Sequence, residues 1–164
     1  MEIREYRSGD FKACVELFVR VFNGEPCRDQ WTQERASQYL DEAVHRRGFL
    51  GYVAVEDASA RHGAQAAPQG LIFGHKVVWW NGDQFMIQMM CVETGTQRRG
   101  VGSALLKHLK RQLDLKGFMQ INLLTRFQEW PASFYRKAGF LESEDLRFFY
   151  YFYKARSRVT LQGR

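Results

Sequence analysis

The hydrophobic and polar positions of the chain follow two patterns, one typical of helices and one of strands. Apolar residues at 14, 17, 18, 21 and 22 have the spacing of an amphipathic helix over 11–22. Similar spacing, together with start and stop residues, predicts helices over 32–46, 101–116 and 131–137. Apolar runs predict strands over 2–6, 49–56, 71–80, 85–92, 119–125, 140–141 and 147–154. The strand over 85–92 is apolar almost throughout, which predicts burial on both faces.

The residues between these elements predict how they connect. Ser8 or Asp10 is expected to cap the first helix and Thr32 the second. Gly24 is expected to end the first helix with a positive φ. Asn81-Gly82 is a hairpin signal, because both residues tolerate positive φ.

The element order predicts an α/β (α+β) fold in one domain, 1–164. A strand at 85–92, a helix and a strand at 119–125 imply a right-handed crossover between parallel strands. We therefore expect a mixed, mostly antiparallel sheet of six to seven strands, with a central βαβ crossover and about four helices. Residues 57–69 lack periodicity and are expected to form a flexible loop, and 155–164 a basic tail.

Composition narrows the class of protein. The 164 residues are 45% hydrophobic and 26% charged, which is too apolar for a disordered chain and too charged for a membrane protein. No apolar run reaches the roughly 18 residues of a spanning helix, and the N-terminus lacks a signal-peptide pattern. We expect a cytoplasmic protein with no membrane partner.

The net charge of +6 owes much to the end of the chain, because 154–164 holds four basic residues and no acidic one. A solvated tail and a contact with an anionic ligand both remain open. The sequence contains no recognisable nucleic-acid-binding motif, so nucleic acid is not an expected partner.

Metal binding is not expected. The cysteines Cys14, Cys27 and Cys91 form no CxxC pair. Cys91 lies in an apolar strand and reads as a small core residue, with a catalytic thiol as the less favoured alternative. The four histidines have no metal-binding spacing, and His108 is expected at the surface.

Residues 97–102, Gln-Arg-Arg-Gly-Val-Gly, stand between a predicted strand and the helix that begins at Val101. The first N–H groups of a helix have no partner within it, and the helix dipole adds partial positive charge there. Gly100 and Gly102 let a ligand approach the backbone, and Arg98 and Arg99 add fixed charge. The turn therefore predicts a binding site for a diphosphate.

Three phosphate-binding motifs compete for this turn. A P-loop needs GxxxxGK[ST], which is absent, and a dinucleotide fingerprint needs Gly or Ala where Leu105 stands. The turn is similar to the Gln/Arg-x-x-Gly-x-Gly/Ala motif of the GCN5-related N-acetyltransferase (GNAT) superfamily, at Gln97, Gly100 and Gly102.

A second segment resembles the same superfamily. Residues 132–140, Ala-Ser-Phe-Tyr-Arg-Lys-Ala-Gly-Phe, follow the turn after one predicted helix and one predicted strand, as in that family. With the element order, the resemblance covers roughly residues 1–153. Many members carry Asn three residues before the Ala of this segment, where this chain has Glu129.

The resemblance implies that acetyl-CoA is the co-substrate. The contacts that it implies lie at the end of the fourth strand, in the turn and in the second motif: Cys91, Val92, Gln97, Arg98, Arg99, Gly100, Val101, Gly102, Ser103, Phe134 and Lys137. The fourth and fifth strands would separate to admit the pantetheine arm. A backbone N–H around 90–92 would polarise the thioester carbonyl.

Two catalytic roles follow for the transfer of an acetyl group to an amine. A protonated amine cannot attack a thioester, so a base must accept its proton. Glu93, directly after the fourth strand, is the favoured base, acting directly or through water, and Glu129 is its rival. Tyr135 matches the family tyrosine that gives a proton to the departing thiolate.

Acceptor recognition is expected from the connection between the first two helices and from the third-to-fourth-strand hairpin. Glu25, Trp31, Trp79 and Trp80 lie there, and Trp130 and Glu129 lie in the second motif. Acidic and aromatic groups suit a cationic amine, although the tryptophans could equally belong to the core or to a dimer interface.

The leading interpretation is an N-acetyltransferase that acts on a small-molecule primary amine by direct attack in a ternary complex. Two alternatives remain open, namely a protein or peptide N-acetyltransferase and a CoA-binding module without turnover. The family is often dimeric, so a homodimer is a further expectation.

Overall fold

The computed structural model describes residues 1–56, 67–126 and 128–151, and for Glu129 the backbone only. It forms two compact units, Met1–Leu124 and Thr125–Arg164, which are described separately below. Most of the loop predicted at 57–69 and the whole basic tail at 155–164 lie outside the described residues. The organisation of 1–164 as one domain stays a prediction.

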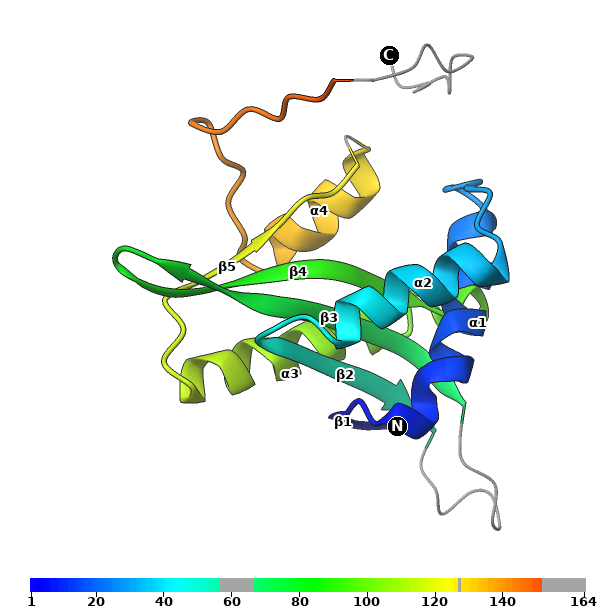
Figure 1. Ribbon diagram of the computed structural model, residues 1–164. Coiled ribbons are helices and arrows are strands. Elements are labelled where there is room, and N and C mark those ends of the chain that lie inside the picture. The colour runs from blue at the N-terminus through cyan, green and yellow to red at the C-terminus, as the bar shows by residue number, and fades with distance from the viewer. Residues whose placement is uncertain (57–66, 127, 152–164) are drawn as a thin grey trace. The chain divides into compact units, whose positions relative to one another are not determined.

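The first unit is built on a five-stranded mixed sheet (Figure 1). Its strands, in spatial and chain order, are β1 (Glu2–Glu5), β2 (Phe49–Val55), β3 (Pro68–Trp79), β4 (Gly82–Val92) and β5 (Gln120–Leu123). Neighbours from β1 to β4 are antiparallel, and β4 and β5 are parallel. The mixed fold class and the crossover are confirmed. The count of six to seven strands is wrong for the described chain, because 140–141 and 147–151 form no strand.

Helices cover both faces of this sheet. α1 (Phe11–Asn23) and α2 (Gln33–Val44) lie on one face, and α3 (Val101–Leu115), which connects β4 to β5, lies on the other (Figure 1). In the second unit, α4 (Glu129–Lys137) matches the predicted short helix. The alternation of β2 explains the layering, because Val53 and Val55 pack with α1 and α2, whereas Tyr52 faces His108 of α3.

Helix starts and stops agree with the sequence in part. The hydroxyl of Thr32 accepts the Arg35 N–H at 3.2 Å and caps α2 as expected. Asp10 precedes α1, but its carboxylate makes no capping bond to that helix and instead accepts two bonds from Arg4 at 2.7 Å. Gly24 follows α1 with φ −78°, so the expected positive φ was wrong.

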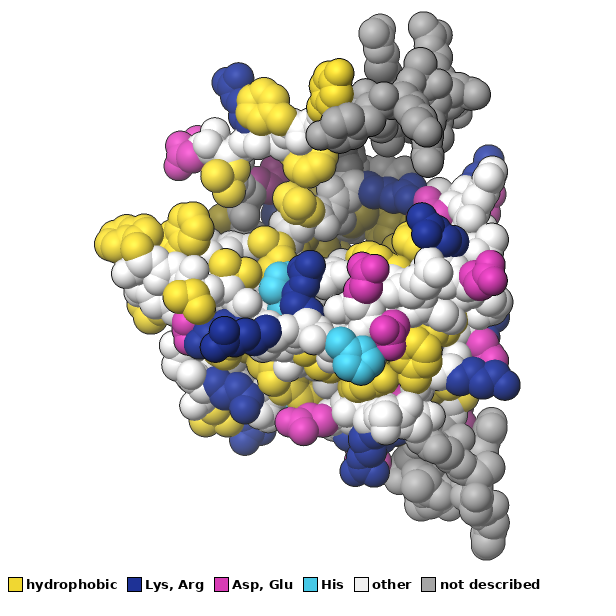
Figure 2. Space-filling model, viewed as in Figure 1, with side chains coloured by type: hydrophobic (Ala, Val, Ile, Leu, Met, Phe, Trp, Pro, Cys, Tyr) yellow, Lys and Arg dark blue, Asp and Glu magenta, His cyan; other side chains and the backbone are white. Residues whose placement is uncertain are grey.

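The β3–β4 hairpin turns one residue earlier than predicted. Trp79 pairs with Gly82, which places Trp80 and Asn81 in the turn and Gly82 in the strand. The hairpin end is apolar and exposed, with 88% of Trp80 accessible, and Figure 2 shows hydrophobic side chains gathered there.

β4 contains a bulge directly after the last residue that pairs with β5. Phe73 pairs with Met89 and Gly74 with Ile87, so Gln88 is an extra residue in β4. Pairing with β5 extends only from Gln84 to Ile87. Within the described residues, the β4–β5 pairing therefore stops at Ile87, although the backbone continues as β4 to Val92.

The expectation that β4 is buried on both faces was wrong. Alternate side chains are buried and the others are half-exposed along 85–92. The bulge also changes which layer the buried side chains join. Met89 and Cys91 belong to the core with α1 and α2, whereas Phe85 packs edge-on against Phe118.

Candidate active site

The connection from β4 to α3 folds back on the end of its own strand. After Glu93, a single 3-10 turn spans Thr94–Thr96, and the Thr96 N–H donates to the Glu93 carbonyl at 2.8 Å. The side-chain Nε2 of Gln97 donates to the Val92 carbonyl at 3.1 Å. Gln97, which was predicted to contact the cofactor, thus also holds the β4–α3 connection against the end of β4.

The start of α3 presents backbone donors to solvent. Arg98 has φ 60° and Gly100 has φ 87°, so the backbone bends sharply before the helix begins. The first helical bond runs from the Ala104 N–H to the Gly100 carbonyl at 2.9 Å. In the described part of the chain, no backbone carbonyl accepts the N–H groups of 98–103.

This turn has the donors and the space that a diphosphate needs. Arg98, Arg99, Gly100 and Ser103 are exposed, and Gly102 is half-exposed. A Cβ placed on Gly100 would meet no atom within 4 Å, so the space beside the turn is open. Peptide N–H groups, a helix dipole and two guanidinium groups form a donor set suited to a diphosphate. Val101 is buried and anchors the turn to the core.

The thiol of Cys91 lies in the core. Its side chain is 5% exposed and belongs to the core under α1 and α2. Burial raises the pKa of the Cys91 thiol, which opposes formation of a nucleophilic thiolate. This agrees with the interpretation of Cys91 as a core residue.

Glu93 lies at the end of β4 with both carboxylate oxygens engaged. Its Oε1 accepts the Thr94 N–H at 3.1 Å. Its Oε2 accepts Nε and Nη2 of Arg20 at 3.1 and 2.8 Å. The backbone N–H of Glu93 donates to the Gln69 carbonyl at 2.8 Å, which continues the β3–β4 pairing past the strand.

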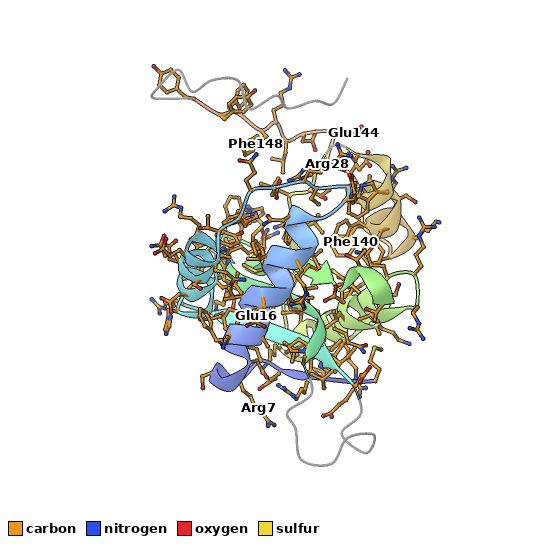
Figure 3. The ribbon with its side chains drawn as sticks, turned by 90° about the vertical axis from the view of Figure 1, so that its right-hand side faces the viewer. Arg7, Glu16, Arg28, Phe140, Glu144 and Phe148 are labelled. Atoms are coloured by element: carbon orange, nitrogen blue, oxygen red, sulfur yellow. The ribbon has the colours of Figure 1, made fainter. Side chains whose placement is uncertain are left out.

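Arg20 is the residue that sequence reasoning missed at this site. It lies in the last turn of α1, the helix that faces the viewer in Figure 3. In the sequence it is one more polar residue on the exposed face of an amphipathic helix. Nothing local connects it to a carboxylate 73 positions later.

In the second unit, α4 brings Phe134, Tyr135 and Lys137 together. The rings of Phe134 and Phe140 lie edge-on to Tyr135, at centroid distances of 5.1 and 5.6 Å. Burial raises the pKa of Tyr135 from 10.0 to about 12, so the phenol stays protonated at neutral pH. Lys137 is exposed. Glu129 begins α4, and its side chain lies outside the described residues.

The residues predicted to recognise the acceptor are not all at one place. Trp31 packs with Phe18 and Tyr39 against the core. Glu25 forms an ion pair with Arg28, and Arg28 lies beyond the end of α1 (Figure 3). Trp80 lies at the opposite end of β4 from Glu93, about 30 Å away along the strand by its rise per residue.

Trp79 shares that hairpin end, and Trp130 in α4 donates its Nε1–H to Gln128 at 2.9 Å. Trp31 therefore has a structural role, and the hairpin tryptophans lie far from Glu93.

Two remaining expectations concern metal and membrane. Among the described residues, no group of three or more His, Cys, Asp or Glu side chains could hold a metal ion. No described helix is long and apolar enough to cross a membrane. The surface position expected for His108 was only partly right, because its ring packs against Tyr52 at 4.7 Å and is half-exposed.

Comparison with known proteins places this geometry among acetyltransferases. The profile of the acetyltransferase (GNAT) domain matches residues 47–142. No curated protein sequence matches the chain. Among solved structures, a probable acetyltransferase superposes with a TM-score of 0.76 at 16% identity, over 95% of this chain and 100% of that chain.

Two further solved structures of similar fold are those of aminoglycoside acetyltransferases. One, from an uncultured soil metagenomic sample and in complex with sisomicin, has a TM-score of 0.70 at 19% identity, over 93% of this chain and 96% of that chain. The other, an aminoglycoside antibiotic 6'-N-acetyltransferase from Acinetobacter haemolyticus, has a TM-score of 0.67 at 14% identity, over 94% and 100%. At such identities the similarity shows the fold alone.

Proposed function

This chain belongs to the GNAT acetyltransferase family, and on that premise we propose that it transfers an acetyl group from acetyl-CoA to a primary amine of a small molecule. The observation that carries the proposal is the start of α3, where the N–H groups of 98–103 lack backbone acceptors among the described residues. These amides, with Arg98 and Arg99, would hold the diphosphate of the cofactor. Gln97 would act by holding the loop against Val92.

The end of the β4–β5 pairing supports a place for the rest of the cofactor. Among the described residues, pairing with β5 ends at Ile87, so the pantetheine arm would run along the last part of β4, beyond that pairing. Acetyl-CoA supplies an activated thioester when bound. A backbone N–H near Cys91 or Val92 would stabilise the negative charge that develops on the thioester oxygen.

Two side chains, those of Glu93 and Tyr135, would carry out the two proton transfers of the reaction. Glu93 would accept the proton of the acceptor ammonium group, so that the neutral amine can attack directly in a ternary complex. Tyr135 would donate its proton to the departing sulfur, a role that suits a phenol with a raised pKa because it is protonated at neutral pH. No covalent enzyme intermediate is required.

Isothermal titration with CoA and with pantetheine, which lacks the diphosphate and the 3′-phosphoadenosine attached to it, tests the binding half of the proposal. We expect CoA to bind at least about tenfold more tightly, since the diphosphate gains several charge-assisted hydrogen bonds. Equal affinities for CoA and pantetheine would show that the start of α3 does not bind the diphosphate.

The catalytic half is tested with a panel of amines and thiol detection of released CoA, with mass spectrometry of the products. We expect amine-dependent CoA release and a mono-acetylated small molecule. Acetylated peptides without acetylated small amines would instead favour the peptide acetyltransferase. CoA binding without turnover of any amine or peptide would favour the binding module.

A further inference from the structure

The ion pair between Arg20 and Glu93 lies beside the carboxylate proposed as the base. Arg20 uses two N–H groups, Nε and Nη2, on the single oxygen Oε2 of Glu93. The two side chains are 53% and 30% exposed, so the pair is open to solvent. Such surface pairs contribute little to stability, so a ligand can compete with them at small cost.

The guanidinium of Arg20 is only partly used. Its Nη1 has no hydrogen-bond or ion-pair partner among the residues described in the structure. A planar guanidinium can bind one carboxylate along its Nε side and another at its Nη end. Arg20 therefore has room for a second anion next to Glu93.

Glu93 is held in a fixed orientation independently of Arg20. The Thr94 N–H binds Oε1, and the bond from the Glu93 N–H to Gln69 holds the backbone. The oxygen bound by Arg20, Oε2, is the other one. An anion that draws Arg20 away from Oε2 would leave that oxygen ready to accept a proton.

We propose, on the basis of the proposed function, that the acceptor is an amine with a carboxylate on the neighbouring carbon, as in an α-amino acid. Its carboxylate binds first at the Nη1 end of Arg20 while its ammonium group binds Glu93, and these two ion pairs with the ligand then compete with the pair between Arg20 and Glu93. Competition for Arg20 weakens its hold on Oε2, and Glu93 then takes the ammonium proton. The neutral amine nitrogen attacks the thioester carbonyl, the C–S bond breaks, and Tyr135 gives its proton to the departing sulfur to form CoA. The second proton that the nitrogen loses as the amide forms passes through solvent and restores the Tyr135 phenol.

Arg20 also disfavours the alternative acceptors. A polyamine or an aminoglycoside carries several cations and no carboxylate, so Arg20 would repel it beside the base. Arg20 is thus a specificity-determining residue, and the acceptor chemistry differs from that named for the two aminoglycoside acetyltransferases of similar fold.

Matched acceptor pairs test this inference. Initial rates of CoA release are measured for tyrosine against tyramine, histidine against histamine, and ornithine against 1,4-diaminobutane. We expect kcat/KM for the amino acid to exceed that for its decarboxylated partner by at least about tenfold, as lost charge-assisted hydrogen bonds allow.

The variant Arg20→Gln tests whether the preference for the amino acid comes from recognition of its carboxylate or from a difference in the intrinsic reactivity of the two amines. We expect it to bring the paired kcat/KM values to within about threefold, mainly by raising KM for the amino acid. Arg20→Lys should retain part of the preference. Arg35→Gln, an exposed arginine whose side chain bonds Gln38 on its own helix, should leave the ratio unchanged. Circular dichroism and CoA affinity confirm that each variant is folded.

The outcomes distinguish the two proposals. Turnover of the amines equal to that of the amino acids, or a ratio unaffected by Arg20→Gln, overturns this inference while the acetyltransferase stands. Absence of CoA binding overturns the proposed function. If CoA binds but no acceptor turns over, calorimetry with the CoA-loaded protein compares the same pairs, and failure to prefer the amino acid overturns the inference.

Discussion

The side-chain amide of Gln97 donates to the backbone carbonyl of Val92 at 3.1 Å, joining the start of the Gly-rich turn to the last residue of β4. This bond spans the segment that contains Glu93 and the 3-10 turn. It therefore couples the candidate diphosphate site to the candidate base through a few residues of backbone.

Gln97→Glu is expected to weaken CoA binding about fivefold to tenfold. The carboxylate cannot donate to the Val92 carbonyl, and a lost hydrogen bond of about 1 kcal/mol corresponds to about fivefold. The added negative charge near the diphosphate increases the loss. Titration calorimetry measures the effect, and Gln30→Glu, at an exposed glutamine in the connection between α1 and α2, adds the same charge outside the turn. Equal effects of the two variants would show that only net charge matters.

Gly100→Ala tests the backbone of the turn. An L-residue at φ 87° costs about 1–2 kcal/mol, and the new methyl would meet no atom within 4 Å, so the effect is conformational rather than steric. Gly117 has φ 74° and equally open surroundings at the other end of α3, which makes Gly117→Ala a matched control. We expect both variants to lose stability and only Gly100→Ala to lose CoA affinity. If both variants lose CoA affinity, the turn at Gly100 has no specific role in CoA binding.

Tyr135→Phe is expected to lower kcat by about tenfold or more, in the range of lost acid–base assistance. Burial raises the pKa of Tyr135 from 10.0 to about 12, so its proton is present throughout the neutral range. The kcat profile of the wild type should therefore show no inflection from this phenol below about pH 10. Burial also raises the pKa of Tyr6 to about 12, so Tyr6→Phe is a control for loss of a buried phenol.

The same raised pKa predicts an alkaline loss of stability. The folded state disfavours the ionised phenol, so the contribution is complete below pH 10 and is lost as pH rises towards about 12. Urea unfolding between pH 9 and 11 should show a smaller decline in Tyr135→Phe than in the wild type. Identical declines would place the phenol in solvent.

Glu93→Gln is expected to shift the pH–rate curve to higher pH. Without a base, the reaction depends on the fraction of acceptor that is already neutral, and this fraction rises with pH. Glu42→Gln, at an exposed glutamate on α2, serves as the control. Superimposable curves for wild type and Glu93→Gln would move the base to Glu129 or to water.

Asp10→Ala is expected to destabilise the first unit by about 3–5 kcal/mol, because it leaves Arg4 without its partner in a buried ion pair. Asp10 is 1% exposed and accepts two bonds from Arg4 at 2.7 Å and one from the Arg7 N–H at 2.9 Å. Glu25→Ala removes an exposed pair with Arg28 and should leave the urea midpoint unchanged. Equal midpoints for both variants would contradict the structural role of Asp10.

The sequence by itself determined the features that depend on nearby residues. The helical spacing in α1, the cap at Thr32 and the turn ahead of Val101 are local, since capping and helix formation involve residues within a few positions. The two motifs at 97–102 and 132–140 likewise indicated the family, which the match over 47–142 shows.

Tertiary structure decided what depends on distant residues. The bulge at Gln88 directly follows the last β4–β5 pair, and it depends on the register with β3, which no local pattern specifies. Trp31 and Trp80 are similar in the sequence, but Trp31 packs against the core and Trp80 is exposed, because burial depends on which elements pack together. Arg20 meets Glu93 only because α1 packs across the end of β4. The two residues are far apart in the sequence, but the fold brings their side chains close enough to form an ion pair.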